Sequence, residues 1–577
     1  MYFPTSSLVT FRLSKFIQII SLLLLFALPV FGIEPVFTTR QQTVRPLAVP
    51  ADTRLITPKD VALYGVYGYS AWQLGPGTNA GRRFDLMPDG YAGAANAAQL
   101  LSFFSMTDIH ITDKESTAQL PYYGWMMPPH TGGLSASAYS PIILSTTHVL
   151  DAAVKTINAL HRQAPFNFGI CLGDVANSTQ LNEVRWFIDV LDGQTITPSS
   201  GAHLGAQTIG YQKPYQAAGL DRSILWYQAI GNHDQYWMGT EPVTEKVRAA
   251  QVGREVLNMD PNPFKPNASE GAGVYVGVVD GSTPHGDVIK GGPTNAYLTP
   301  PTVAADSNRL SVVTATSSTA TFIGEFYKTT TLPQGHGFNR ANTGSTAACY
   351  TFLPLANLPL KVIVLDDTCK TNDPAAGPMF YGGGWMDAAR LAWLTNELQL
   401  GQDSNQLMIV ACHIPISPQT DLSNTAKAAP QFNDYQAETN LLATLHHYPN
   451  LILVMAGHRH LNTVTPQPAP DPAHPEYGFW EVESPSLRDY PQQFRTWEIL
   501  RNSDNSISIL TTDVDPVVEP GSPAWNSRGY AIGIARIAGN VSNSDITPHV
   551  YNAELVKYLT PTMQAKIASC GAPLAQR

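Results

Sequence analysis

The sequence predicts an α/β fold, and three of its features support that prediction. Apolar runs of strand length alternate with segments whose apolar residues recur at helical spacing. The runs are continuously apolar, which is typical of strands covered on both faces, so helices are expected on each side of the sheet. Polar residues able to bind metals directly follow several runs, at the strand ends where open α/β sheets place their sites.

The expected elements follow one another in a regular order. Strands are predicted at 100–106, 166–172, 225–230, 360–365, 406–412 and 451–455, and helices at 146–163, 180–192, 385–399 and 435–447. Three alternating strands, at 478–483, 496–500 and 506–511, indicate the second half of a sandwich. The stretch 238–347 interrupts this order, and its length predicts a lid, a small subdomain or a disordered segment; we favour a β-rich cap.

Composition limits the classes of function. The chain of 577 residues is 44% hydrophobic and 14% charged, which allows a large core. Its formal net charge is −10, whereas general nucleic-acid binding requires a basic surface. No nucleic-acid partner is therefore expected.

The N-terminus has the features of a signal peptide. Arg12 and Lys15 precede an almost wholly apolar run, 16–31, which Pro29 breaks near its end. Residues 1–32 are therefore predicted to be removed during export, which leaves a periplasmic or secreted protein. The alternative is an uncleaved anchor, although the run is short for a full membrane span. Membrane contact is expected only through this segment, if it is uncleaved.

Five cysteines are few for an exported chain of this size. Cys171 and Cys412 lie within predicted strands and are expected to be buried apolar residues. Cys349 and Cys369 flank a predicted strand pair and could form a disulfide in an oxidising compartment, but the sequence leaves their pairing open.

Five short motifs in a fixed order carry the chemistry. They are Asp108-Ile109-His110, Gly173-Asp174, Gly231-Asn232-His233-Asp234, His413 and Gly457-His458-Arg459-His460. The set offers carboxylates, imidazoles and an amide but no thiolate, which suits two adjacent divalent or trivalent metals of intermediate hardness. Because a two-metal site is suited to displacement at phosphorus, the pattern indicates a phosphoesterase.

The first two motifs provide carboxylates. Asp108 and His110 are two residues apart in a strand end, so their side chains point the same way and can reach one metal. Asp174 leaves its strand at a sharp turn, and its two oxygens can bridge two cations. Both patterns are weak by themselves, and Asp174 could instead cap a helix.

The third motif is the most specific one. Asn232 offers a metal a neutral oxygen, His233 can face outward as a proton donor, and Asp234 is placed to orient that imidazole and favour its charged form. The alternative interpretation is a polar turn between a strand and a helix.

The last two motifs provide imidazoles. A lone histidine at a strand end is more often structural, and His413 is credible because a ligand is needed between the third and fifth motifs. His458 and His460 lie on the same side of an extended segment, as a metal pair would, whereas Arg459 points the other way, toward backbone or substrate.

Residues near the motifs are candidates for substrate contact. Tyr236 and Trp237 could shape a leaving-group pocket, or could pack under the insertion. Arg488 and Arg495 could contact an anionic substrate, although surface ion pairing is the better expectation for both.

The motif set resembles that of the calcineurin-like metallophosphoesterase superfamily, whose pattern is Asp-x-His, Gly-Asp, Gly-Asn-His-Asp/Glu, His and Gly-His-x-His. The resemblance implies an α/β fold of four layers, α/β/β/α, in which two mixed sheets are flanked by helices and a large insertion is added. It implies a first metal held by Asp108, His110, Asp174 and His460, and a second held by Asp174, Asn232, His413 and His458. It further implies that His233 is the catalytic acid or transition-state stabiliser and that Asp234 orients it.

One departure from the superfamily concerns iron. The purple acid phosphatase branch has a tyrosine ligand three residues after the Gly-Asp aspartate, where this chain has Asn177. A purple iron site is therefore not expected. The two metal ions remain open among manganese, iron, zinc and cobalt.

The resemblance also implies a domain organisation and an activity. The metallophosphoesterase domain is expected at 96–237 and 348–515, with a signal peptide at 1–32, extensions at 33–95 and 516–577, and a cap at 238–347. The expected reaction is hydrolysis of phosphomonoesters or phosphodiesters, on a small molecule or a lipid, by in-line attack of a metal-bridging hydroxide. The alternatives are a diesterase restricted to lipid head groups or cyclic nucleotides and a non-catalytic, metal-stabilised binding protein. The presence of both His233 and Asp234 argues against the binding protein.

Overall fold

The computed structural model describes Met1 and residues 36–129, 141–259, 273–314, 319–373, 381–416, 435–539 and 551–574. The chain divides into two units, Met1–Val36 and Phe37–Arg577, and the fold below is that of the second unit. The predicted signal peptide lies outside the described residues, apart from Met1. Across the described helices, none has both the length and the apolar character that crossing a bilayer requires.

Two large mixed sheets form the core. The eight-stranded sheet has the order β3 (Gly81–Leu86), β20 (Asn552–Lys557), β19 (Ile507–Val514), β18 (Phe494–Asn502), β4 (Asn96–Met106), β5 (Phe168–Cys171) and β8 (Leu225–Gln228), and β21 (Ala572–Pro573) pairs with β4. The six-stranded sheet has the order β12 (Tyr350–Phe352), β13 (Leu360–Val364), β14 (Leu407–Ala411), β15 (Leu451–Ala456), β17 (Phe479–Glu483) and β16 (Thr463–Gln467).

The two sheets pack on each other. The rings of Tyr227 on β8 and Phe352 on β12 stack with their centroids 3.6 Å apart. Elsewhere, Nε1 of Trp480 on β17 donates a hydrogen bond to the carbonyl oxygen of Val556 on β20, at 3.1 Å. One face of each sheet is therefore covered by the other sheet, and the expectation of helices on both faces is corrected accordingly.

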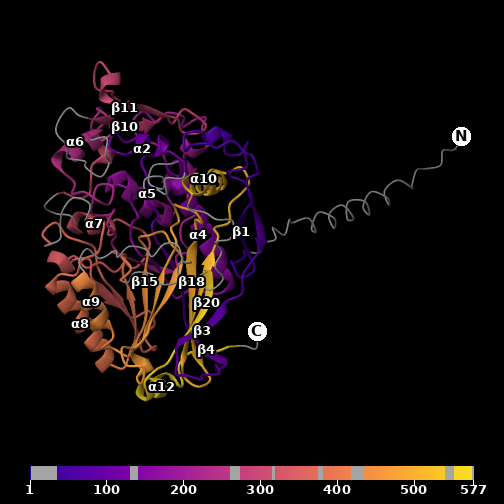
Figure 1. Cartoon of the computed structure of the whole chain (residues 1–577), viewed down its shortest axis with the longest axis vertical. Helices are drawn as coiled ribbons and strands as arrows, with labels where there is room; N and C mark the ends of the chain where they lie inside the picture. Colours follow the sequence, from indigo (N-terminus) through magenta and orange to yellow (C-terminus); the bar gives the residue numbers. More distant parts are fainter. Residues whose placement is uncertain are drawn as a thin grey trace. The chain divides into compact units, whose positions relative to one another are not determined.

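Helices cover the outer sides. α8 (Ala388–Asp403) and α9 (Tyr435–Leu445) flank the six-stranded sheet (Figure 1). Leu394 and Leu398 of α8 share one apolar cluster with Met408 and Val410 of β14. In the other half, α4 (Thr146–Gln163) connects β4 to β5, and α5 (Leu181–Asp192) connects β5 to β8. The predicted sandwich of two mixed sheets flanked by helices is confirmed.

Several remaining elements surround this core. They are β1 (Gln42–Pro46), β2 (Trp72–Pro76), α2 (Pro121–Trp125), β6 (Thr195–Ile196), β7 (Tyr215–Gln216), α6 (Glu245–Val252), β9 (Asn258–Met259), β10 (Val274–Val279), β11 (Val288–Pro293), α7 (Thr319–Glu325), α10 (Pro523–Ala538) and α12 (Pro561–Ile567). β9, β10 and β11 form a small sheet inside the insertion 238–347, which also contains α6 and α7. That insertion's role as a cap stays a prediction.

Two expectations about organisation need correction. β3 and β20 belong to the eight-stranded sheet, so the segments 33–95 and 516–577 contribute strands to the core rather than merely extending it. β17 runs parallel to β15 in the six-stranded sheet, whereas β18 and β19 lie in the other sheet. The pairing of Cys349 and Cys369, which the sequence leaves open, is also answered: both thiols are buried, and they form no disulfide with each other.

The strand directions determine where a site can form. β4, β5 and β8 are parallel neighbours, and so are β13, β14, β15 and β17. All five motifs come after the carboxyl ends of strands in these two sets. A site built from them therefore lies where the carboxyl ends of the two sheets meet.

Candidate metal centre

Contacts between the motifs show that the two sets of strand ends meet. The main-chain N–H of His458, after β15, donates a hydrogen bond to Oδ2 of Asp108, after β4, at 2.9 Å. Nε2 of His413, after β14, lies 3.3 Å from Oδ2 of Asp174, after β5. Residues that are about 240 to 350 positions apart in the sequence are thus assembled into one buried cluster.

The first group of possible ligands contains Asp108, His110 and His460. Nε2 of His460 lies 3.3 Å from Oδ1 of Asp108 and 3.1 Å from Nε2 of His110. Nε2 of His110 lies 3.7 Å from the same carboxylate oxygen. These donor atoms converge on one small volume, as the sequence predicts for the first metal.

The second group centres on the amide oxygen of Asn232. Oδ1 of Asn232 lies 3.0 Å from Nε2 of His413 and 3.1 Å from Nδ1 of His458. An amide oxygen and two imidazole nitrogens therefore face one another, in the combination expected for the second metal.

Asp174 joins the two groups through one oxygen. Its Oδ2 lies 3.6 Å from Nε2 of His110, in the first group, and 3.3 Å from Nε2 of His413, in the second. Its Oδ1 accepts a hydrogen bond from the main-chain N–H of His233 at 2.8 Å. Oδ2 is therefore the oxygen that lies between the two groups, whereas Oδ1 is held by the main chain.

The cluster creates a potential that favours cations. Burial tends to raise the pKa of Asp108, but the adjacent His460 and further histidines lower it well below its usual range. Burial tends to lower the pKa of His413, yet Asp174 and other carboxylates raise it to about 10. The pKa of His460 likewise rises to about 10, because Asp108 and Asp489 outweigh burial. Carboxylates taken out of water thus stay ionised and attract positive charge.

The residues present fit a pair of metal ions. Oδ1 of Asp108 is buried and accepts no hydrogen bond from any part of the chain that the structure describes. It faces Nε2 atoms of His110 and His460, which themselves lie within 3.1 Å of each other. A buried carboxylate oxygen that lacks a donor carries a free-energy cost, which a coordinated cation removes. The set of nitrogen and oxygen donors suits manganese, iron, zinc or cobalt.

The main chain at the ligands is strained. Five of the seven predicted ligands have positive φ angles: Asp108 (52°), His110 (46°), Asp174 (54°), His458 (77°) and His460 (59°). The left-handed region costs a side-chain-bearing residue about 1–2 kcal/mol. Such strain persists where the surrounding structure imposes it, and it clusters at functional sites.

Two motif glycines allow this close assembly. A Cβ atom on Gly231 would lie 2.1 Å from Oδ1 of Asp174, and one on Gly457 would lie 2.6 Å from Oδ2 of Asp108. Any side chain at either position would push a ligand carboxylate out of place. The glycines of the Gly-Asn-His-Asp and Gly-His-x-His motifs thus keep the strand ends close to the ligands.

The predicted proton donor, His233, lies beside the first group. Its ring meets the His110 ring edge-to-face, with centroids 4.4 Å apart, and its Nδ1 donates to the carbonyl oxygen of Asn177 at 2.7 Å. Burial lowers the pKa of His233, with Asp174 acting in the opposite direction. Gly239 covers the ring so closely that a Cβ there would lie 2.2 Å from Cδ2 of His233.

Asp234 is bonded to the main chain and not to the ring of His233, so the expected direct contact between the two side chains is corrected. Its carboxylate is fully buried and accepts hydrogen bonds from four main-chain N–H groups, those of Asp174 (2.9 Å), Val175 (3.0 Å), Ala176 (3.3 Å) and Gly231 (2.9 Å). Asp234 therefore fixes the backbone that presents Asp174. The partner of His233 is a carbonyl oxygen, which no side-chain pattern reveals.

The candidate substrate contacts, Arg459 and Tyr236, both have partners within the protein. Arg459 pairs with the buried carboxylate of Glu483, its Nη2 2.7 Å from Oε2. Tyr236 is 1% exposed and donates its hydroxyl to the carbonyl oxygen of Cys369 at 2.7 Å. Both side chains are engaged in the protein interior.

The two further arginines are buried rather than paired at the surface. Arg495 lies 3.4 Å from Asp513 within the eight-stranded sheet. Arg488 is 2% exposed and donates a hydrogen bond to Oδ1 of Asn177, next to His233. Asn177 joins Arg488 to His233 through its side-chain oxygen and its main-chain carbonyl.

The segment after β17 makes contacts with the centre that sequence reasoning missed, although the sequence indicates Arg488 within it as a candidate substrate contact. Asp489 accepts a hydrogen bond from Nδ1 of His460, and Ser486 donates its hydroxyl to the carbonyl oxygen of Asp108 at 2.7 Å. β17 is parallel to β15, so its carboxyl end reaches the same edge as the motifs. A correct assignment of that strand to the parallel set would have pointed to this segment.

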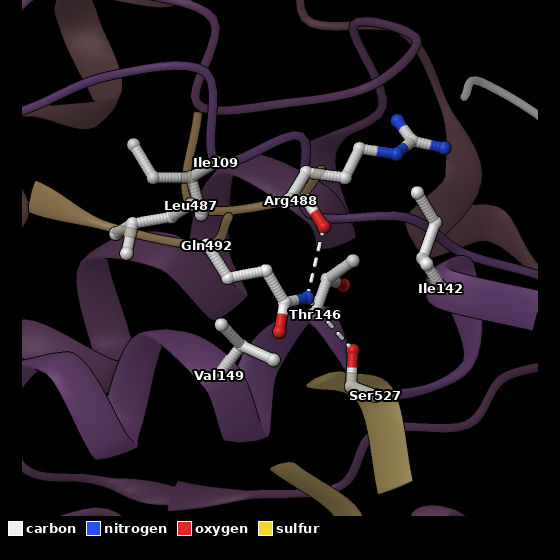
Figure 2. Close-up of a pocket in the computed structure, with 8 residues that line it drawn as sticks. All are labelled: Ile109, Ile142, Thr146, Val149, Leu487, Arg488, Gln492 and Ser527. Atoms are coloured by element: carbon white, nitrogen blue, oxygen red, sulfur yellow. Dashed lines mark hydrogen bonds between the residues drawn. The ribbon is translucent and has the colours of Figure 1, made fainter. Parts of the chain in front are cut away.

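A narrow void lies behind the same segment (Figure 2). It is lined by Ile109, Ile142, Thr146, Val149, Leu487, Arg488, Gln492 and Ser527. Ile109 is the residue between the ligands Asp108 and His110, so apolar packing supports this motif from behind. Gln492 crosses the void, and its Nε2 donates to the carbonyl oxygen of Arg488 (2.9 Å) and to Oγ of Ser527 (3.1 Å).

Comparison with known proteins adds little. No family model and no curated protein matches the chain. A solved dimetal phosphatase from Danio rerio is similar at a TM-score of 0.34 and 11% identity, covering 73% of this chain and 97% of that one. A structure described as GAP50, the anchor in the inner membrane complex of Plasmodium, has a TM-score of 0.29 and 9% identity, covering 76% of this chain and 95% of that one. Likeness at this level carries no conclusion about activity.

Proposed function

We propose that this chain is an exported metallophosphoesterase of the calcineurin-like type that uses two metal ions to hydrolyse phosphomonoesters or phosphodiesters. One observation carries the proposal: a single oxygen of Asp174 lies between two adjoining groups of donor atoms, 3.6 Å from Nε2 of His110 and 3.3 Å from Nε2 of His413. A carboxylate oxygen in this position can be shared by two adjacent cations.

The donor set favours a catalytic centre over a structural one. Structural metal sites are typically closed by thiolates or imidazoles, whereas this centre mixes carboxylates, imidazoles and an amide, with no cysteine among the converging atoms. When bound, a pair of ions supplies Lewis-acid stabilisation of a phosphoryl group and an activated water.

His233 supplies the proton chemistry. Its Nδ1–H is committed to the carbonyl oxygen of Asn177, so Nε2 is the atom free to exchange a proton with substrate. In the neutral ring Nε2 accepts a proton, and in the protonated ring it donates one. The negative charge of a bound phosphoryl group favours the protonated ring, which can then stabilise a leaving oxygen.

Export is the second part of the proposal. It is supported by the two basic residues Arg12 and Lys15, which are followed by the apolar run 16–31. The substrate would then be a small-molecule or lipid phosphoester outside the cytoplasm. An N-terminal sequence of the protein recovered from its native compartment tests export: cleavage near residue 32 supports it, and an intact N-terminus contradicts it.

The activity is tested with paired aryl phosphate mono- and diesters. The purified chain is stripped with a chelator, reloaded with manganese, iron, zinc or cobalt, and compared with Asp174→Ala treated in the same way. Hydrolysis that returns with metal in the wild type and not in the variant supports the proposal. Two bound metals with no hydrolysis of either ester would instead favour a metal-stabilised binding protein.

A further inference from the structure

The short segment Ser486–Asp489 contacts both a predicted metal ligand and the hydrogen-bond partner of the predicted proton donor. It begins at Ser486, whose hydroxyl donates to the carbonyl oxygen of Asp108 at 2.7 Å. The same hydroxyl oxygen accepts the main-chain N–H groups of Arg488 (2.8 Å) and Asp489 (3.2 Å). The segment is thereby fastened to a ligand motif and curled into a compact turn.

Two adjacent side chains leave this turn toward different targets. Asp489 accepts the Nδ1 hydrogen bond of His460, whose Nε2 faces Oδ1 of Asp108 at 3.3 Å. Arg488 donates to Oδ1 of Asn177, whose main-chain carbonyl holds Nδ1 of His233 at 2.7 Å. One side chain thus reaches a predicted ligand, and its neighbour reaches the partner of the predicted proton donor.

We propose that the segment Ser486–Asp489 is a dual positioning element, in which Asp489 orients His460 for the first metal and Arg488, through Asn177, orients His233 for proton transfer. The inference rests on the proposed function, because it assigns roles within that same centre. None of the five sequence motifs contains Arg488 or Asp489.

The chemistry at His460 favours the first role. A hydrogen bond from Nδ1 to a carboxylate fixes the tautomer in which Nε2 carries the lone pair that binds a metal, and it makes that nitrogen a stronger donor. The bond also restricts rotation of the ring, at a residue whose main chain is itself held at a positive φ of 59°.

The packing around Arg488 favours the second role. Arg488 is 2% exposed, and Asn177 is fully buried, so neither side chain has room to change its conformation. Asn177 is held from its other side as well, because its Nδ2 donates to Oε1 of Gln119 at 2.7 Å. Gln492 anchors the turn from behind by joining it to Ser527 of α10 (Figure 2).

The two roles predict separable defects, which one experiment distinguishes. Metal affinity of the full-length wild type and of Asp489→Asn is measured by chelator competition with manganese or zinc, without substrate. We expect one of the two metals to bind about 10–100-fold more weakly in Asp489→Asn and the other to be unchanged. Asp489→Glu, which restores the carboxylate, is expected to recover part of the loss. Equal affinity of both sites in wild type and Asp489→Asn overturns the first role.

The role of Arg488 is read from the dependence of kcat on the leaving group, at saturating metal. Arg488→Gln and Asn177→Ala are each expected to bind both metals normally and to lose about 10–100-fold in kcat on aryl phosphates with poor leaving groups. Loss on good leaving groups should stay within about threefold. Because the two residues act in series, the double variant should be no slower than the worse single one. Equal loss across all leaving groups, or additive effects, overturns the second role.

Matched controls keep the outcomes interpretable. Asp515→Asn removes another buried, hydrogen-bonded carboxylate outside the centre and should alter neither metal affinity nor leaving-group dependence. If Arg488→Gln fails to fold, Asn177→Ala carries the same test, because it leaves the carbonyl partner of His233 in place. If the wild type binds two metals but hydrolyses no ester, the proposed function fails, and the affinity of Asp489→Asn still decides the first role.

Discussion

Nδ1 of His233 donates a hydrogen bond to the main-chain carbonyl oxygen of Asn177, 2.7 Å away. The orientation of the predicted proton donor therefore depends on the path of the backbone after Asp174. Asp234 holds that backbone by accepting the N–H groups of residues 174, 175 and 176. Asp234 thus acts on His233 indirectly, through the main chain. Substitutions of the two residues should therefore have different effects.

Replacing His233 by alanine should affect rate and not metal content. A ring nitrogen of His233 lies within 4.8 Å of ligand atoms of His110 and Asp174. His233 is not among the seven predicted ligands, however, so both metals should remain bound. Loss of a positioned proton donor typically costs about 10²–10⁴-fold, and the loss should be largest for poor leaving groups. Metal counting by mass spectrometry and a leaving-group series measure both quantities. Full turnover on an alkyl phosphate would show that another group donates the proton.

Replacing Asp234 by asparagine should instead lower stability. In the wild type, four main-chain N–H groups share the two carboxylate oxygens of Asp234. Asparagine replaces one of these oxygens with an NH₂ group, which cannot accept their hydrogen bonds, so buried donors are left unsatisfied. We expect a loss of about 2–4 kcal/mol in the free energy of unfolding, measured by urea denaturation. The exposed Asp504→Asn should cost less than about 0.5 kcal/mol. A variant that is as stable as the wild type but has no activity would show that Asp234 takes part in catalysis.

The pair formed by Arg459 and Glu483 should stabilise the fold and contribute nothing to substrate affinity. Arg459→Met leaves the buried Glu483 carboxylate without its cation, which is expected to cost about 3–5 kcal/mol in the free energy of unfolding. Adding Glu483→Gln should recover part of that loss. KM for an aryl phosphate should stay within about twofold of wild type. A stable variant with a tenfold higher KM would restore Arg459 as a substrate contact.

Lys557 should make stability depend on pH. It is fully buried on β20, and burial lowers its pKa to about 7, against an ordinary value near 10.4. Between pH 7 and 10 the unfolded chain carries a proton on this lysine that the folded chain lacks, so stability rises with pH. Relative to Lys557→Met, the wild type should gain up to about 2 kcal/mol between pH 7 and 9. Urea unfolding of both proteins at several pH values measures the gain, with Lys566→Met as a surface control. A pH-independent difference would contradict the shift.

The sequence predicts the regular core well because its patterns are local. Continuous apolar runs gave the strands that became β4, β5, β8, β13, β14 and β15, and helical spacing gave α4 and α5 within a residue or two of their observed ends. The predicted metal ligands converge because motifs after parallel strands lie at one edge of each sheet, and the carboxyl ends of the two sheets meet.

What the sequence misses depends on tertiary contacts. The alternating pattern of β17 predicts that it lies beside β18. Its sheet is determined instead by its pairing with β15 and β16, which the local pattern does not indicate. Asp489 follows that strand, so its contact with His460 could not be foreseen without the pairing. Asp234 sits next to His233 in the sequence, and adjacency suggested a contact that the turn of the backbone prevents.

The measurement that tests the central claim most directly is anomalous diffraction from crystals of the manganese- or zinc-loaded protein. The account predicts two anomalous peaks about 3.5–4 Å apart, one on each side of Oδ2 of Asp174, with His110 and His460 at one and His413 and His458 at the other. A single peak, or no peak within this cluster at saturating metal, would contradict the two-metal centre.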